Sequence, residues 1–168
     1  VYSGTDTYFL NYRLQELKDV SGCVVEGGSG SGIQLVTLAK LNESIETAIG
    51  VEIDARAINV SRFNAILNGV SDQVSIVEGL DSLDAALGGR EISLGFSNPP
   101  FVAAPEFVKI EEEEVQLLPP EAEAIKDGDN YVVDMKQLFM KAGWGGEDGL
   151  QITKQFLDLF NQNLAPDG

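Results

Sequence analysis

The sequence predicts an α/β fold, a three-layer α/β/α sandwich built around a mainly parallel sheet. Strand-like and helix-like segments alternate over residues 21–97 with short links, a pattern typical of a parallel sheet covered on both faces. A glycine-rich loop follows the first expected strand, and a stiff Asn-Pro-Pro-Phe segment follows the fourth. Both lie at the carboxyl ends of strands, where open parallel sheets bind their ligands.

The expected elements follow from apolar periodicity and from residues that begin or end helices. Asp54 is suited to cap a helix that Asn68 and Gly69 would end. Helices are expected over residues 6–18 (capped by Thr5 or Asp6), 33–41, 55–67 and 150–164, and strands over 23–25, 47–53, 74–77 and 92–96. Apolar residues expected on inner helix faces are Phe9, Leu10, Leu14, Leu17, Ala57, Ile58, Phe63, Ile66 and Leu67. The apolar residues of the last expected helix are Ile152, Phe156, Leu157, Leu159 and Phe160.

The length of 168 residues fits one domain. We expect an N-terminal helix over residues 1–20, a cofactor-binding core over 21–101, an acidic insert over 102–143 and a following helix over 144–168. Four adjacent glutamates in the insert favour a solvated lid, with a recognition strip for a basic substrate as the alternative.

The last four residues form a turn sequence that would lead into a further strand. Without such a strand, the fourth expected strand would be an exposed apolar edge, which proteins normally cover. We therefore expect the sheet to be incomplete in this chain, with strands one to four present.

The composition restricts the chemistry. The chain has no histidine, which excludes histidine bases, histidine-ligated metals and Ser-His-Asp triads, and the acidic run lacks the spacing of a calcium loop, so no metal is expected. The one cysteine, Cys23, lies in an apolar strand and is expected in the core. The net charge of −16 predicts a soluble protein that repels nucleic acid, with a basic protein partner as a further possibility.

No apolar run approaches the length of a membrane helix, so no membrane partner is expected. The expected location is the cytoplasm, or an organelle if a targeting segment precedes Val1, which is not a start methionine.

The loop at residues 26–32 runs from a strand into a helix and carries several closely spaced glycines. Such a loop lets the backbone approach a ligand without Cβ clashes, beside the positive end of a helix. The phosphate loop of nucleoside triphosphatases is excluded because Ile33, and not lysine, follows Gly32. The dinucleotide fingerprint is also excluded, since Ile33 and Leu35 stand where it needs glycine or alanine.

An acidic-x-Gly-x-Gly-x-Gly pattern remains, and Glu26 leads it. A second carboxylate, Glu52, ends the second strand twenty residues past Gly32. At that offset a carboxylate can accept both hydrogen bonds of a ribose diol.

The Asn-Pro-Pro-Phe segment is expected to hold a planar amino group. The side-chain oxygen of Asn98 and the carbonyl of Pro99 can accept its two hydrogens, and Phe101 offers a flat apolar surface. Pro99 and Pro100 stiffen the turn and remove two backbone donors. The candidate catalytic residues are therefore Asn98, Pro99, Pro100 and Phe101, which position the nitrogen and need not include a strong base.

Residues 24–83 resemble the S-adenosylmethionine-binding half of class I methyltransferases, through the glycine loop and the stretches 50–57 and 64–70. The resemblance implies a Rossmann-like fold and S-adenosyl-L-methionine as cofactor. The glycines would line its methionine and ribose, Glu26 would lie near the methionine amine, Glu52 would hold the ribose hydroxyls and Ile53 would pack on the adenine. The implied cofactor-binding residues are Glu26, Gly28, Ser29, Gly30, Gly32, Glu52, Ile53, Asp81 and Asn98.

The chain departs from this family at one position. Many members have an aspartate after the third strand that receives the adenine amino group, and here Leu80 stands in its place. Either Asp81 takes that role through a shifted turn, or the contact is lost.

The segment 98–101 is similar to the Asn-Pro-Pro-Tyr/Phe motif of the amino-methylating branch, which includes adenine-N6 and release-factor glutamine-N5 methyltransferases. Residues 1–10 and 144–150 look like flanking segments of its small-domain members. The resemblance implies an N-methyltransferase. A glutamine side-chain amide of a protein is the favoured acceptor, and an adenine of RNA or DNA, or a small molecule, is the alternative.

Two readings from other classes stay open. One is a non-catalytic partner subunit that keeps the methyltransferase fold, and the other is an NAD-dependent oxidoreductase, which the glycine spacing disfavours. Tyr131, Trp144 and Phe139 are candidates for lining a substrate pocket, with core packing as the safer assignment for Phe139.

Overall fold

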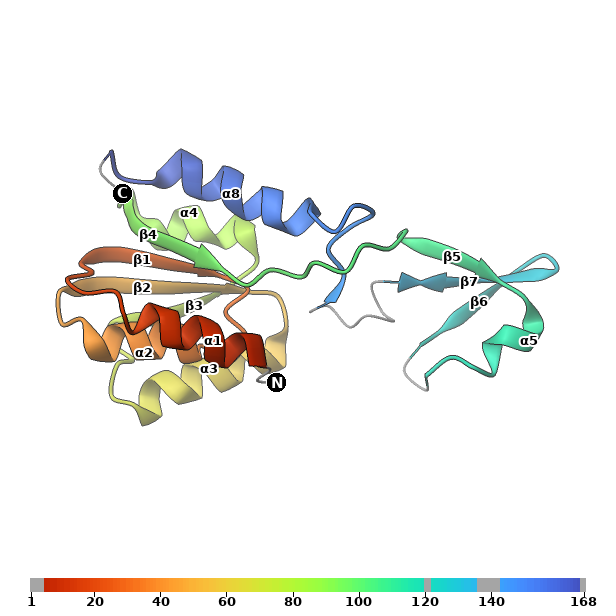
Figure 1. Cartoon of the computed structure of the whole chain (residues 1–168), viewed down its shortest axis with the longest axis horizontal. Helices are drawn as coiled ribbons and strands as arrows, with labels where there is room; N and C mark the ends of the chain where they lie inside the picture. The colour runs from red at the N-terminus through yellow and green to blue at the C-terminus, as the bar shows by residue number, and fades with distance from the viewer. Residues whose placement is uncertain (1–4, 120–121, 136–142, 167–168) are drawn as a thin grey trace. The chain divides into compact units, whose positions relative to one another are not determined.

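The computed structural model describes residues 5–119, 122–135 and 143–166. The chain divides into two compact units, one of residues 1–98 and 158–168 and the other of residues 99–157 (Figure 1). None of the helices in the described ranges combines the length and the apolar character that crossing a bilayer requires.

A four-stranded parallel sheet forms the centre of the first unit. Its strands are β1 (Gly22–Gly27), β2 (Ile45–Glu52), β3 (Val74–Glu78) and β4 (Ile92–Ser97), in the order β3-β2-β1-β4. In register, Val25 of β1 lies between Ile49 of β2 and Gly95 of β4. Because the strands are parallel, all four carboxyl ends lie at one edge, and the predicted α/β fold is confirmed.

Helices cover both faces of this sheet (Figure 1). Those on one face are α1 (Thr5–Leu14), α2 (Ile33–Leu41) and α3 (Ala55–Leu67), while α4 (Leu83–Leu87) and the last residues of α8 (Gln151–Asn163) lie on the other. A short 3-10 turn, η1 (Leu80–Ser82), links β3 to α4. The core between the layers includes Val24, Leu35, Leu38, Ile45 and Ile49, and Cys23 is buried as expected.

The bounds predicted for α2 and α3 are confirmed to the residue. Their ends are encoded locally, since Asp54 caps α3 by accepting a hydrogen bond from the Ala57 N–H at 2.8 Å. After α8, Leu164 forms a parallel bridge with Ile92, and the Ala165 N–H donates to the Ile92 carbonyl at 2.9 Å. The chain there runs alongside β4.

The prediction for the first helix was wrong at its end and on one face. The helix ends at Leu14, four residues before the expected end, and the side chain of Phe9 is 68% exposed. Leu14 is buried and Leu10 packs against the core, whereas Leu17 is partly exposed. Positions four apart share a helix face, while position nine is rotated away from that face.

The inner face of α3 also differs from the prediction. Phe63, Ile66 and Leu67 are exposed, and the buried positions are Ala57, Ile58, Ser61 and Ala65. These mostly small residues lie on one side of the helix at spacings of one, three and four. They allow α3 to approach the glycine loop closely.

The second unit contains a three-stranded antiparallel sheet in the segment predicted as an acidic insert. The strands are β5 (Phe107–Ile110), β6 (Ala124–Asp127) and β7 (Asn130–Asp134), in the order β5-β7-β6. The glutamate run forms the short helix α5 (Glu112–Val115), whose N-terminus is closed by reciprocal hydrogen bonds between Glu111 and Glu114. The run is therefore a capped, exposed helical turn, and its role as a lid stays a prediction.

Replacing Gly95 by alanine should destabilise the first unit by about 1–3 kcal/mol, the usual cost of overpacking. A Cβ at this position would lie 2.8 Å from the ring of Phe160 on α8. Urea unfolding measures the loss, which should shrink in a Phe160→Leu background. An equal loss in both backgrounds would contradict the proposed clash.

Candidate functional site

The glycine loop joins β1 to α2 at the carboxyl edge of the sheet. Gly28, Gly30 and Gly32 have φ angles of 67°, 54° and 70°, in the left-handed region that favours glycine. The carbonyl of Val51 accepts hydrogen bonds from the N–H groups of Gly28 and Ser29, at 2.8 and 3.1 Å. The loop is thus held against the end of β2.

Contacts with α3 fix the other side of this loop. A Cβ added at Gly32 would lie 2.0 Å from the hydroxyl oxygen of Ser61, so only glycine fits there. The side-chain amide of Asn64 donates to the Ser31 carbonyl at 2.9 Å. No local sequence pattern points to a role for Ser61 or the Asn64 side chain, although both lie on the face of α3 that carries Ala57 and Ala65.

Glu52 ends β2 and faces the glycine loop. One carboxylate oxygen, Oε2, accepts a hydrogen bond from the Gly30 N–H at 2.8 Å. The other, Oε1, accepts from the N–H groups of Ile53 and Asp54 at 2.7 and 3.0 Å. A carboxylate offers about four acceptor positions, so this oriented group retains capacity for a ligand hydroxyl.

Glu26 lies beneath the loop and is only 2% exposed. Burial raises the pKa of its carboxyl well above the ordinary range, and the negative charge of Glu52 acts in the same direction. The backbone N–H of Leu35, in the first turn of α2, acts against this shift. One oxygen, Oε2, has no hydrogen-bond partner among the described residues.

Two serine hydroxyls, like the Glu26 carboxyl, are buried and lack a hydrogen-bond partner among the described residues. The Oγ atoms of Ser29 and Ser61 are buried, and neither has a hydrogen-bond partner within the described part of the chain. Ser29 points toward β2, since a Cβ built at Gly50 would lie 2.7 Å from its hydroxyl oxygen. Buried polar groups in native proteins are nearly always paired, so this cluster fits a polar ligand or ordered water at the loop.

The ends of β2 and β3 contribute two further candidate residues. Ile53 follows Glu52 and is 53% exposed, which leaves an apolar surface beside the loop. Asp81 lies in η1 and is exposed. The structure therefore brings Glu26, the three glycines, Ser29, Glu52 and Ile53 to the carboxyl ends of β1 and β2, and the ligand role of Asp81 stays a prediction.

Asn98 follows β4 directly and is exposed. Its side-chain Nδ2 donates a hydrogen bond to Oδ2 of Asp6, in the first turn of α1, at 2.7 Å. This hydrogen bond is the main cause that lowers the pKa of Asp6. The contact joins residues 92 positions apart, and no local sequence pattern pairs them.

The rest of the proline segment, from Pro99 onward, belongs to the second unit. The aromatic side chain of Phe101 is 70% exposed, as a stacking surface requires. The backbone of Pro100 and Phe101 lies against a second glycine-containing loop. A Cβ at Gly145 would be 2.8 Å from the Pro100 carbonyl oxygen, and one at Gly149 would be 2.6 Å from that of Phe101.

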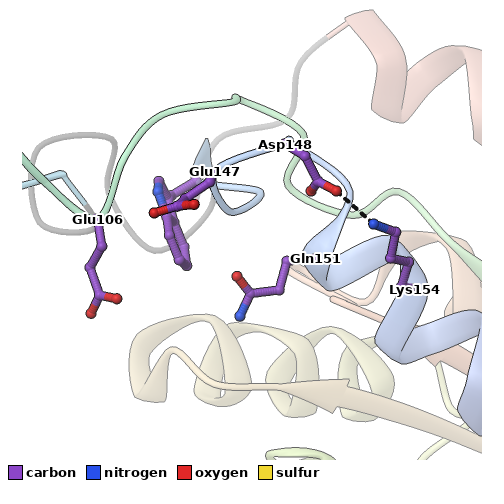
Figure 2. Close-up of a pocket in the computed structure, with 6 residues that line it drawn as sticks. Glu106, Glu147, Asp148, Gln151 and Lys154 are labelled. Carbon is purple, nitrogen blue, oxygen red and sulfur yellow. Dashed lines mark hydrogen bonds and ion pairs between the residues drawn. The ribbon is translucent and has the colours of Figure 1, made fainter.

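A pocket in the second unit lies at the start of α8 (Figure 2). Its lining residues are Glu106, Trp144, Glu147, Asp148, Gln151 and Lys154. The carboxylate of Asp148 faces the ammonium of Lys154 at 2.6 Å, and this hydrogen bond is the main cause that lowers the pKa of Asp148. The indole N–H of Trp144 donates to the Ala104 carbonyl at 2.9 Å.

Three aromatic residues were expected from the sequence to be candidates for lining a substrate pocket. Trp144 lines this pocket. Tyr131 lies on β7, and the ammonium of Lys126 lies over its ring, 5.8 Å from the ring centre. Phe139 and residues 1–4 lie outside the described residues. In the described ranges, no three His, Cys, Asp or Glu side chains are grouped to hold a metal ion.

Comparison with known proteins identifies the family. The model of the methyltransferase small domain family matches residues 5–138, and the chain belongs to that family. A release factor glutamine methyltransferase from Dictyoglomus turgidum is 29% identical over 146 residues, which cover 87% of this chain and 44% of the relative. A ribosomal protein L11 methyltransferase from Salmonella arizonae is 44% identical over 68 residues, 40% of this chain and 22% of the relative.

One solved structure supports the fold. Precorrin 8W decarboxylase of Methanobacterium thermoautotrophicum aligns with a TM-score of 0.52 at 15% identity, over 100% of this chain and 61% of that protein. The chain spans less than half of the length of the two methyltransferase relatives.

The stability of the chain should depend on the proton of Glu26. Burial raises the pKa of this carboxyl in the folded state, so the unfolded chain loses its proton at a lower pH. The resulting stability is fully present below the unfolded pKa and is lost as the pH rises through the folded pKa. As the pH rises, the free energy of unfolding of wild type should therefore fall relative to that of Glu26→Gln, by up to about 1.4 kcal/mol per pH unit.

Urea unfolding between about pH 4 and 8 measures this difference. Glu46→Gln makes the same chemical change at an exposed position of β2 and should run parallel to wild type. If Glu26→Gln also ran parallel to wild type over this range, the raised pKa would be wrong.

Proposed function

We propose that this member of the methyltransferase small domain family transfers a methyl group from S-adenosyl-L-methionine to the planar amino group of a protein side chain. The favoured acceptor is a glutamine amide. The proposal rests chiefly on one observation, the cluster of the glycine loop, Glu26 and Glu52 at the carboxyl ends of β1 and β2, with Asn98 at the end of β4. In this proposal residues 1–168 act as one domain, with 102–143 as an insert.

Family membership implies S-adenosyl-L-methionine as the methyl donor. When bound, it supplies an electrophilic methyl group, and the acceptor nitrogen loses one proton on methylation. The residues at the loop fit such a ligand because they combine a left-handed glycine backbone with buried oxygen atoms that have no partner among the described residues. Gly28, Gly30 and Gly32 would line its methionine and ribose, with Ser29 beside them.

The carboxylates have separate roles in this proposal. Glu52 would accept a ribose hydroxyl at its remaining acceptor position, since three backbone N–H groups already fix its orientation. Glu26 would lie near the methionine amine, and the exposed side chain of Ile53 would pack on the adenine. Asp81 would receive the adenine amino group, a role that the exposed position in η1 leaves open.

The methyl-accepting group would be held by the segment that begins at Asn98. The side-chain oxygen of Asn98 and the Pro99 carbonyl would accept the two hydrogens of the amino group, and Phe101 would stack on the attached π-system. Pro100 would keep the turn stiff. Holding the nitrogen in one orientation supplies much of the rate enhancement that such a site needs.

Two observations favour a protein acceptor over nucleic acid. The names of both relatives refer to protein targets, a release factor and a ribosomal protein. The net charge of −16 opposes binding to phosphate backbones. An adenine amine of RNA or DNA presents the same planar group and is the second candidate acceptor, and a basic protein partner would suit the acidic surface.

Glu52→Ala should weaken binding of S-adenosylhomocysteine by about ten-fold or more, or about 1.4 kcal/mol, because the variant loses the ribose acceptor and the hydrogen bond to Gly30. Calorimetric titration measures this. Glu46→Ala, on the same strand but exposed, is the matched control and should bind as wild type does. Equal affinity in all three proteins would rule out the assigned ribose contact.

Asn98→Ala should lower methyl transfer by about 100-fold, because the variant loses the side-chain oxygen that would hold the acceptor amino group. The assay follows tritium from labelled donor into a glutamine-containing release-factor domain, into RNA and into DNA. Asn59→Ala, at an exposed position of α3, serves as the control. Transfer to nucleic acid alone would replace the protein acceptor, and full activity of Asn98→Ala would refute the role of Asn98.

A further inference from the structure

The first turn of α1 reaches the residue that follows β4. Oδ2 of Asp6 accepts a hydrogen bond from Nδ2 of Asn98 at 2.7 Å. Both side chains belong to the first unit, and both are exposed. A residue at the amino-terminal end of the described chain therefore contacts the side chain proposed to hold the acceptor.

The chemistry of an asparagine amide gives this contact a consequence. The amide has a donor end, the NH2 group, and an acceptor end, the carbonyl oxygen. Rotation by half a turn exchanges the two ends at little intrinsic cost, since this torsion is broad and roughly two-fold. An acceptor amino group can be held only if the oxygen faces it, because two NH2 groups cannot hydrogen bond to each other through their hydrogens.

An ionised carboxylate decides between these two orientations. It accepts hydrogen bonds and donates none, so it attracts the NH2 end of Asn98 and repels the oxygen end. With Nδ2 bound to Asp6, Oδ1 faces away from that carboxylate. Asp6 thus selects the orientation that a hydrogen-bond donor on a substrate needs.

We infer that Asp6 is a positioning residue, whose carboxylate holds the amide of Asn98 with its oxygen presented to the acceptor amino group. The inference rests on the proposed function and adds to it a residue outside both the glycine loop and the Asn-Pro-Pro-Phe segment. Asp6 acts through Asn98 and makes no contact with the reacting atoms in this account.

The structure of α1 supports this role. Leu14 of the helix is buried and Leu10 packs against the core, so the helix is anchored to the sheet layer. The link after the helix is fixed where the Val20 N–H donates to Oδ1 of Asn42 at 3.2 Å. The hydrogen bond from Asn98 lowers the pKa of Asp6 below its usual range. An aspartate carboxyl is ionised and purely accepting at neutral pH.

The first test compares kinetics of Asp6→Ala with those of Asp72→Ala. Asp72 is an exposed aspartate just before β3, at the opposite edge of the sheet from Asn98. We expect Asp6→Ala to lower kcat by about ten-fold or more, with the affinity for S-adenosylhomocysteine unchanged within about two-fold. Asp72→Ala should match wild type. A role of Asp6 in folding alone would lower the affinity and the kcat together.

The second test exchanges the pair. Asn98→Asp alone places two carboxylates at hydrogen-bond distance and should be nearly inactive. Adding Asp6→Asn restores a donor–acceptor pair of reversed polarity, in which the amide at position 6 donates and the second oxygen at position 98 still accepts from the substrate. The double variant should recover at least about ten-fold in kcat over Asn98→Asp.

The outcomes separate the two proposals. Wild type that transfers no methyl group to any of the three acceptors, although it binds S-adenosylhomocysteine, would overturn the proposed function and this inference with it. Wild-type transfer combined with an unchanged kcat in Asp6→Ala would overturn this inference alone, as would a double variant no more active than Asn98→Asp.

Discussion

The site depends on one constraint, the left-handed backbone of the glycine loop held between the end of β2 and the face of α3. Parallel pairing of β1 with β2 places Gly27 opposite Val51, and the Val51 carbonyl then accepts hydrogen bonds from two loop N–H groups. The carboxylate of Glu52 accepts a hydrogen bond from the Gly30 N–H. On the other side, Ser61 leaves no room for a Cβ at Gly32. The loop conformation is thus imposed by the register of two strands and by one helix.

The polar groups buried at this loop lower the stability of the fold and at the same time favour the binding of a polar ligand. A carboxyl and two hydroxyls lie buried at the loop, each with an oxygen that has no partner in the described part of the chain. Each such atom costs free energy when it stays unpaired. The cost is characteristic of a site prepared for a polar ligand, because the missing hydrogen bonds can form on binding. The raised pKa of Glu26 has the same cause, since burial disfavours its charged form.

The segment proposed to hold the acceptor is organised differently. Asn98 lies exposed at the end of β4, and its side-chain amide donates a hydrogen bond to Asp6 on a helix that precedes the whole sheet in sequence. The glycines at positions 145 and 149 allow a close backbone approach to Pro100 and Phe101 in the second unit. The glycine loop therefore relies on buried packing, whereas the segment that begins at Asn98 relies on hydrogen bonds and glycine contacts from distant parts of the chain.

The sequence by itself determined the α/β class, the bounds of α2 and α3 and the residues of the glycine loop, because these features are encoded in neighbouring residues. A cap such as Asp54, or a glycine that must adopt a positive φ, acts over three or four positions. The roles proposed for Glu52 and Asn98 likewise came from their places, Glu52 at the end of one strand and Asn98 directly after another.

Tertiary structure decided what depends on distant partners. It turned Phe9 and Phe63 outward, because the inner face of a helix is set by the layer it packs on and not by its most apolar stripe. It formed an antiparallel sheet from the acidic insert and joined Asp6 to Asn98. It also left the oxygens of Glu26, Ser29 and Ser61 without partners among the described residues. Contacts over such sequence separations leave no local pattern, so only the folded chain reveals them.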